Sequence, residues 1–222
     1  MERLTFGKGN MKMKELATHL GMPFSHIVTF DLPAGWSCPK ANACLSRVNR
    51  DTGKRTDYGQ FVCYATKAES IYPAVRNSRW RNFDAIKACS TVEDIANLLE
   101  GNLPKHVEIV RIHSSGDFFS KKYFLAWVEV AKRNPTIEFF AYTKVLAYAN
   151  SSDILSDNFG IVYSYGSKDD ATRDEFAPYV PTCYVNTPEN TYPVPVVCNG
   201  ENTAHEDFYK IFKQESFAIN FH

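Results

Sequence analysis

Apolar stretches of strand length alternate with amphipathic stretches of helix length along the middle of the chain. Buried strands are predicted at 26–32, 106–113, 137–144 and 160–166, which are rich in Val, Ile, Phe and Tyr. Helices are predicted at 79–89, 90–101, 120–135 and 205–214, with a shorter one near 146–155. Strands that alternate with helices indicate an α/β fold with a mostly parallel sheet and right-handed crossovers.

Capping residues mark two of the predicted helices. Ser90 or Thr91, each with an acidic residue three positions later, begins the helix that Gly101 ends. Ser120 begins the next helix, and Pro135 stops it. These signals fix the predicted helix ends more closely than the apolar pattern alone.

Polar and small residues follow each predicted strand directly. They are Gly35-Trp36-Ser37-Cys38, Ser114-Ser115-Gly116-Asp117, Thr143-Lys144 and Ser164-Tyr165-Gly166-Ser167. If the strands are parallel, all four segments lie at one edge of the sheet, where functional groups of α/β proteins collect. With 222 residues and 44% hydrophobic content, we expect a single domain over 1–222, with its core at about 26–178 and an irregular, proline-rich extension at 179–222.

Three of the six cysteines, Cys38, Cys44 and Cys63, lie in one polar stretch. The turn signal at 51–54 predicts a hairpin that places Cys44 nearly opposite Cys63. Clustered thiolates suit zinc or an iron–sulfur centre, and three rather than four leave one coordination position open, as in catalytic sites. Buried free cysteines and a disulfide or redox pair remain as alternatives. Candidate fourth ligands are Cys183, Cys198 and His113, whereas Cys89 is expected in the core.

Four polar residues near the strand ends each have two interpretations. His113 and Arg111 alternate with apolar residues, so we expect them on one strand face. They either contact a carboxylate or phosphate, or form a hydrogen-bonded core histidine beside a paired arginine. Asp117 is a site residue or simply starts a helix, and Lys144 is a site residue or extends along the surface to solvent.

Charge is distributed unevenly, although the formal net charge is zero. Ten basic and four acidic residues give 40–87 a net +6, whereas four basic and eleven acidic residues give 151–222 a net −7. The basic half permits an anionic partner such as nucleic acid, and the alternative is two faces that partly pair with each other.

Arginines and aromatic residues are interleaved in the basic stretch 76–87. That composition suits phosphate contact and base stacking. At helical spacing, however, Trp80, Phe83 and Ile86 also form a core stripe with the arginines outside, and we prefer this second interpretation.

Several classes of protein are disfavoured. No signal-peptide core is present and no run approaches ~18 apolar residues, so we expect a cytoplasmic protein with no membrane partner. G-x-G-x-x-G, P-loop, H-E-x-x-H and G-x-S-x-G motifs are absent, so the usual fingerprints of dinucleotide, P-loop nucleotide, zincin and serine-hydrolase sites are missing.

Six sequence blocks resemble, in this order, the phage protein family called gene product 88. They are FDLPAGWSCPKANACL, TGK, FVCYA, YPAVRNSRWRNFD, VRIHSSGDFFS and FFAYTK, all within about 26–145. That family in turn looks like a shortened relative of the radical S-adenosylmethionine enzymes. The resemblance implies a partial (β/α) barrel with an inserted cysteine-bearing hairpin, and a location in the cytoplasm of the host cell.

The resemblance also implies roles for particular residues. Cys38, Cys44 and Cys63 would hold a [4Fe–4S] cluster whose open iron binds S-adenosylmethionine. Cosubstrate-binding residues would be Ser115, Gly116, Asp117, Thr143 and Ser164, and candidate catalytic residues are His113 and Lys144. We therefore expect an enzyme that begins radical chemistry on an unknown substrate, with a nucleotide or nucleic acid as the expected class. The alternative is a phage binding protein, stabilised by zinc, that docks on nucleic acid or a host protein.

Overall fold

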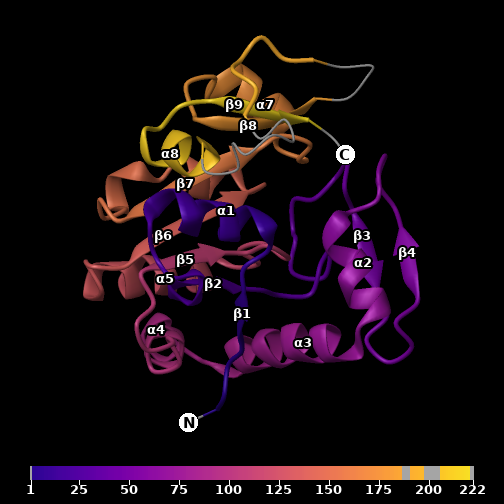
Figure 1. Cartoon of the computed structure of the whole chain (residues 1–222). Helices are drawn as coiled ribbons and strands as arrows, with labels where there is room; N and C mark the ends of the chain where they lie inside the picture. The colour runs from indigo at the N-terminus through magenta and orange to yellow at the C-terminus, as the bar shows by residue number, and fades with distance from the viewer. Residues whose placement is uncertain (1, 187–190, 198–205, 221–222) are drawn as a thin grey trace.

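A seven-stranded sheet forms the centre of the computed structural model, which describes residues 2–186, 191–197 and 206–220 (Figure 1). The strand order is β1-β2-β5-β6-β7-β8-β9. The strands are β1 (Phe6–Lys8), β2 (Ile27–Phe30), β5 (Ile109–Ile112), β6 (Glu138–Thr143), β7 (Phe159–Ser164), β8 (Thr182–Asn186) and β9 (Phe217–Asn220). Only β1 runs antiparallel to its neighbour, and every other pair is parallel. The predicted α/β fold with a mostly parallel sheet is confirmed.

Helices pack on both faces of the sheet (Figure 1). One face packs against α3 (Pro73–Ala88), α4 (Val92–Glu100) and α5 (Lys121–Arg133), with Trp127 and Phe139 fully buried between the layers. The other face packs against α1 (Met11–Leu20) and α8 (Glu206–Phe212). Shorter helical segments are α2 (Tyr64–Ile71), α6 (Leu146–Ala149) and α7 (Asp170–Phe176), with 3₁₀ turns at Phe24–His26 and Ser152–Ile154. Successive side chains of each strand point to opposite faces of the sheet, so a separate hydrophobic core forms on each face.

The capping signals of the sequence set the ends of α4 and α5. Thr91 forms a capping box with Asp94, in which the Asp94 amide donates to the Thr91 hydroxyl and the Thr91 amide donates to the Asp94 carboxylate. Ser120 caps α5 by accepting a hydrogen bond from the Tyr123 amide. All four predicted central strands are present, and their ends differ from the predicted ones by only a few residues.

The carboxyl-terminal region departs from the prediction of an irregular extension. It contributes β8 and β9, which pair in parallel with each other and continue the sheet beyond β7. These strands have only four or five residues, and β8 directly follows Pro181, so the local sequence pattern did not predict them. Pairing with an existing sheet edge makes them strands. The partial-barrel shape stays a prediction, because the described strands form an open sheet with β1 and β9 at its edges.

The predicted cysteine hairpin is present, but with a different register. Strand β3 (Ser46–Val48) pairs with β4 (Arg55–Asp57), and Ser46 lies opposite Asp57. Continued outward, this register would place Cys44 opposite Gly59 rather than Cys63. The chain after Gly59 folds back, with the Phe61 amide donating to the Ala43 carbonyl at 3.0 Å, and this return brings Cys63 toward Cys44.

None of the helices in the described ranges combines the length and apolar character that crossing a bilayer requires.

Candidate site at the carboxyl edge of the sheet

The loop after β2 holds the first cysteine against the hairpin. Gly35 has φ +71°, and its amide donates to the Cys38 sulfur at 3.3 Å. A Cβ at Gly35 would lie 2.1 Å from the Ser46 carbonyl oxygen, so only glycine allows β3 to approach this closely. Ser46 also accepts a hydrogen bond from the Cys63 amide at 3.1 Å. One strand of the hairpin thus positions both the Cys38 turn and the start of α2.

The three predicted thiols lie close enough to change one another's ionisation. A hydrogen bond between the Cys44 and Cys63 side chains lowers the pKa of Cys44 and raises that of Cys63, and burial also raises the pKa of Cys63. Burial raises the pKa of Cys38 to about 12, with the nearby charge of Asp117 adding to the effect. Cys44 is therefore the thiol that ionises first, and its thiolate is also favoured by the positive charge of Lys144.

Asp117 links two of the predicted segments, its own and the Thr143-Lys144 segment. It is buried, and its Oδ1 accepts hydrogen bonds from the Thr143 hydroxyl (2.7 Å) and the Phe118 amide (2.7 Å). Its Oδ2 accepts from the Lys144 amide at 2.9 Å. Burial raises the pKa of this carboxyl, and the three hydrogen bonds act in the opposite direction by favouring the charged form. Asp117 is thus a fixed group of the sheet edge, rather than only a residue that starts a helix.

Lys144 connects the end of β6 to the end of β7. Its ammonium donates to the Tyr165 carbonyl (2.6 Å) and to the Ser164 carbonyl and hydroxyl (both 3.2 Å). The turn that follows contacts the cysteine loop, because the Ala43 amide donates to the Gly166 carbonyl at 3.1 Å. Gly166 has φ +90°, and a Cβ there would meet both Ala43 and Lys144. The Lys144 ammonium is therefore held at the edge and does not simply extend into solvent.

Ser115 and Gly116 join the β2 and β5 loops. The Ser115 hydroxyl donates to the Leu32 carbonyl at 2.9 Å, and the Leu32 amide donates to the Ser115 carbonyl at 2.9 Å. Gly116 has φ +93°, and a Cβ there would lie 2.6 Å from the Ser37 hydroxyl. The predicted residues Cys38, Cys44, Cys63, Ser115, Gly116, Asp117, Thr143, Lys144 and Ser164 thus lie along one connected edge.

His113 is separated from this group by its backbone. It has φ +75°, so its ring leaves the strand alternation and packs against Phe118 and Tyr123, and its Nε2 lies 2.8 Å from the Tyr123 hydroxyl. Burial lowers its pKa to about 3, and the charge of Arg111 contributes. The expectation that His113 and Arg111 share a face is therefore wrong, since Arg111 lies over the Tyr142 ring. A catalytic role for His113 stays a prediction, and its contacts are those of a neutral core histidine.

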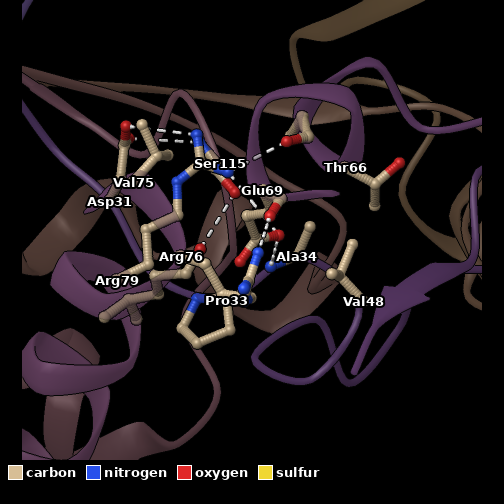
Figure 2. A network of polar contacts seen from close by, with 12 residues as sticks. Asp31, Pro33, Ala34, Val48, Thr66, Glu69, Val75, Arg76, Arg79 and Ser115 are labelled. Carbon is tan, nitrogen blue, oxygen red and sulfur yellow. Dashed lines mark hydrogen bonds and ion pairs between the residues drawn. The ribbon is translucent and has the colours of Figure 1, made fainter. Parts of the chain in front are cut away.

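An ionic network of Asp31, Glu69 and Arg79 contacts the start of the cysteine loop at Ala34 (Figure 2). Glu69 of α2 accepts the Ala34 amide at 3.1 Å, and the Arg79 guanidinium lies between Glu69 (3.5 Å) and Asp31 (3.7 Å). Asp31 in turn accepts the Ser114 and Ser115 amides. Helices α2 and α3 are thereby connected to both the β2 and the β5 loops.

The sequence interpretation of α3 missed this network. Arg76 and Arg79 were expected outside the core, but they are 6% and 7% exposed. Arg79 precedes Phe83 by four residues and Ile86 by seven, and this spacing places all three on one helical face. This spacing could have indicated from the sequence that Arg79 faces the core. The expectation was correct for Phe83 and Ile86 as core residues, and for Arg81, which is exposed.

Comparison with known proteins supplies the family. The profile of the gene product 88 family matches residues 4–207. The chain belongs to the gene product 88 family. Its curated relatives include the Gene 88 protein of Mycobacterium phage L5, 28% identical over 168 residues, and that of Mycobacterium phage D29, 27% identical over 146 residues. These alignments cover 71% and 62% of this chain, and 60% and 52% of the phage proteins. No solved structure matches.

No preformed metal site is present in the part of this gene product 88 protein that the structure describes. Within the described ranges, no group of three or more His, Cys, Asp or Glu side chains is in position to hold a metal ion. Cys183 is buried on β8 in the core shared with α1 and α8, and Cys89 is a partly buried core residue as expected. Cys198 lies outside the described residues. A fourth protein ligand beside the three thiols is therefore not identified among the residues that the structure describes.

Glu69 should make the stability of this gene product 88 protein depend on pH. Burial raises its pKa from 4.5 to about 7, so the folded state retains the proton between those values and the unfolded state releases it. The resulting contribution is complete below pH 4.5 and is lost as pH rises through 7, a change of about 3 kcal/mol. Urea unfolding from pH 4.5 to 8 should therefore show this loss in the wild type and its absence in Glu69→Gln. The exposed control Glu175→Gln should follow the wild type; equal slopes in all three proteins would contradict the assignment.

Proposed function

We propose that this chain is an iron–sulfur enzyme related to the radical S-adenosylmethionine proteins. Cys38, Cys44 and Cys63 would hold a [4Fe–4S] cluster, and the adjacent sheet edge would bind S-adenosylmethionine. The observation that carries the proposal is the convergence of three half-buried thiols, one with a lowered pKa, at the carboxyl edge of a parallel sheet. We further propose that the sheet curves around this edge as a partial barrel.

The donor set fits a soft metal, because all three groups are thiols and Lys144 favours the thiolate of Cys44. Holding a cluster requires the sulfur atoms to turn from their present hydrogen bonds, such as that between Cys38 and the Gly35 amide. We propose that rotation of the three side chains brings the sulfur atoms into position. When bound, the cluster supplies one electron, which cleaves S-adenosylmethionine to methionine and a carbon radical that takes a hydrogen atom from the substrate.

The remaining residues would position the cosubstrate. Asp117 keeps the β5 and β6 loops together and is committed to three internal hydrogen bonds, so its role is to hold the pocket in shape. The Lys144 ammonium is the proposed catalytic side chain, because it is the cation beside the thiols and its position is fixed by Ser164 and Tyr165. Ser115 and Gly116 close the floor between the first two loops.

Metal content tests this function directly. Protein purified without oxygen and supplied with iron and sulfide should be brown and carry about four irons per chain. Cys38→Ala, Cys44→Ala and Cys63→Ala should each lose most of that iron, whereas Cys89→Ala, which alters a core cysteine remote from the edge, should retain it. With a reductant, the loaded protein should convert S-adenosylmethionine to methionine.

Two results would contradict the proposal. A colourless protein with one tightly bound zinc, lost in the same three variants, would support a zinc-stabilised binding protein instead. No metal, together with wild-type stability of Cys38→Ala, would leave the three thiols as ordinary reduced cysteines.

A further inference from the structure

Arg111 is a buried cation without a direct polar partner among the residues that the structure describes. It lies on β5 in the middle of the sheet, between Thr29 of β2 and Phe140 of β6, and is only 8% exposed. Its guanidinium makes no hydrogen bond and no ion pair with any residue that the structure describes, and its Nε is sealed from solvent without an acceptor.

The nearest carboxylates are already engaged by other groups. Asp207 of α8 accepts hydrogen bonds from the Lys12 ammonium (3.1 Å) and from the Tyr142 hydroxyl. Asp31 accepts the Ser114 and Ser115 amides and faces Arg79. Both carboxylates act on Arg111 only through space, so its five N–H donors are left for something else.

Two tyrosines, Tyr142 and Tyr64, lie near the Arg111 guanidinium. The Arg111 Cζ lies 5.3 Å from the centre of the Tyr142 ring, which supports one face of the planar cation. Tyr64 follows Cys63 directly, is 67% exposed, and its hydroxyl donates to the Ser114 carbonyl at the end of β5. An exposed aromatic side chain thus stands between solvent and the strand end where Arg111 lies, beside the cysteine loop.

We propose that Arg111 binds the oxyanion of a ligand, a phosphate or a carboxylate, that approaches beside Tyr64. A bidentate anion would fill guanidinium donors that have no acceptor among the described residues, and Arg is the side chain best suited to such paired hydrogen bonds. The site goes beyond the proposed cluster chemistry and does not depend on it, since the Arg111 donors lack an acceptor in the described part of the chain whether or not the thiols hold metal.

The test uses the full chain without metal, in a chelator-containing buffer at constant ionic strength. Inorganic phosphate and acetate are the two probes, and binding is read from the rise in unfolding temperature with anion concentration. Saturable stabilisation by either anion is the expected result, and the better probe identifies the source as phosphate or carboxylate. Arg111→Gln should lower the affinity by about tenfold or more. The exposed control Arg81→Gln should bind as the wild type does.

The stability of the unliganded variant gives a second readout. Arg111 makes no hydrogen bond or ion pair with the described residues, so Arg111→Gln without anion should lose only the Tyr142 ring contact and the through-space attraction of Asp207 and Asp31, and it should still fold. If it does not fold, Arg111→Lys decides: it keeps the charge but loses the planar fork, and it should bind several-fold more weakly. Absence of saturable stabilisation in the wild type, equal affinity in the Arg111 variants, or equal loss in Arg81→Gln would each overturn the proposal. Metal content plays no part in these outcomes.

Discussion

Replacing Arg79 with alanine should lower the free energy of unfolding by about 3–5 kcal/mol at pH 8. Its guanidinium is buried between Glu69 and Asp31 and donates to the Ala65 carbonyl at 2.9 Å. Alanine would leave the ionised Glu69 buried without a cation. The loss should be smaller at pH 5, where Glu69 is protonated, because its pKa is raised to about 7 by burial. Urea unfolding at the two pH values measures both effects.

A double-mutant cycle separates the ion pair from lost packing. Glu69→Gln combined with Arg79→Ala should recover part of the loss at pH 8, because no unpaired charge then remains. The matched control is Arg81→Ala on the exposed face of α3, which should change stability by less than about 0.5 kcal/mol. If Arg79→Ala lowered the free energy of unfolding, relative to the wild type, by the same amount at pH 5 and at pH 8, Glu69 would not be the charge that Arg79 compensates.

Gly35→Ala should be the most disruptive single methyl addition in the cysteine loop. The left-handed backbone alone costs an alanine about 1–2 kcal/mol. The new Cβ would also lie 2.1 Å from the Ser46 carbonyl oxygen, a backbone atom that cannot move without shifting β3. We expect a total loss of about 2–5 kcal/mol, together with displacement of Cys38 from the other two thiols.

Gly21→Ala is the matched control, because Gly21 also has a positive φ (+67°) but an added Cβ would meet nothing within 4 Å. It should cost only the backbone strain, about 1 kcal/mol. Thermal unfolding gives the two stabilities, and the rate at which a thiol reagent labels Cys38 reports the loop. If both glycine variants lost the same free energy of unfolding, the Ser46 backbone would move away from the added methyl group at no energetic cost.

Local patterns were sufficient for the central layers of the fold. The apolar runs predicted β2, β5, β6 and β7, and capping residues such as Thr91 and Ser120 predicted where α4 and α5 begin. These features are determined by residues close together in the sequence, so they can be predicted from a single sequence. Strands β8 and β9 depend instead on the edge that β7 presents, and no local pattern encodes that edge.

The sequence predicted which residues lie at the site, but not the hairpin register or the direction of the His113 side chain. The parallel arrangement alone placed Asp117, Thr143 and Lys144 at the same edge as Cys38. The hairpin register, however, depends on Gly59 packing against Ala43, with a potential Cβ only 2.3 Å from its carbonyl oxygen, and the sequence midpoint between the cysteines misses this. The left-handed backbone at His113 likewise reverses the face that alternation predicts.

From β2 to β9, the strands of the central sheet stand side by side in the order in which they leave the ribosome, with only the hairpin set apart. Each strand from β5 onward can therefore dock on an edge already in place, and no nascent segment has to be threaded between two earlier ones. The thiols and Arg79 all emerge within the first 79 residues, whereas Asp117, Lys144 and Ser164 arrive with successive later strands. The edge that carries the thiols can thus be completed stepwise during translation, from the cysteine loop to the turn after β7.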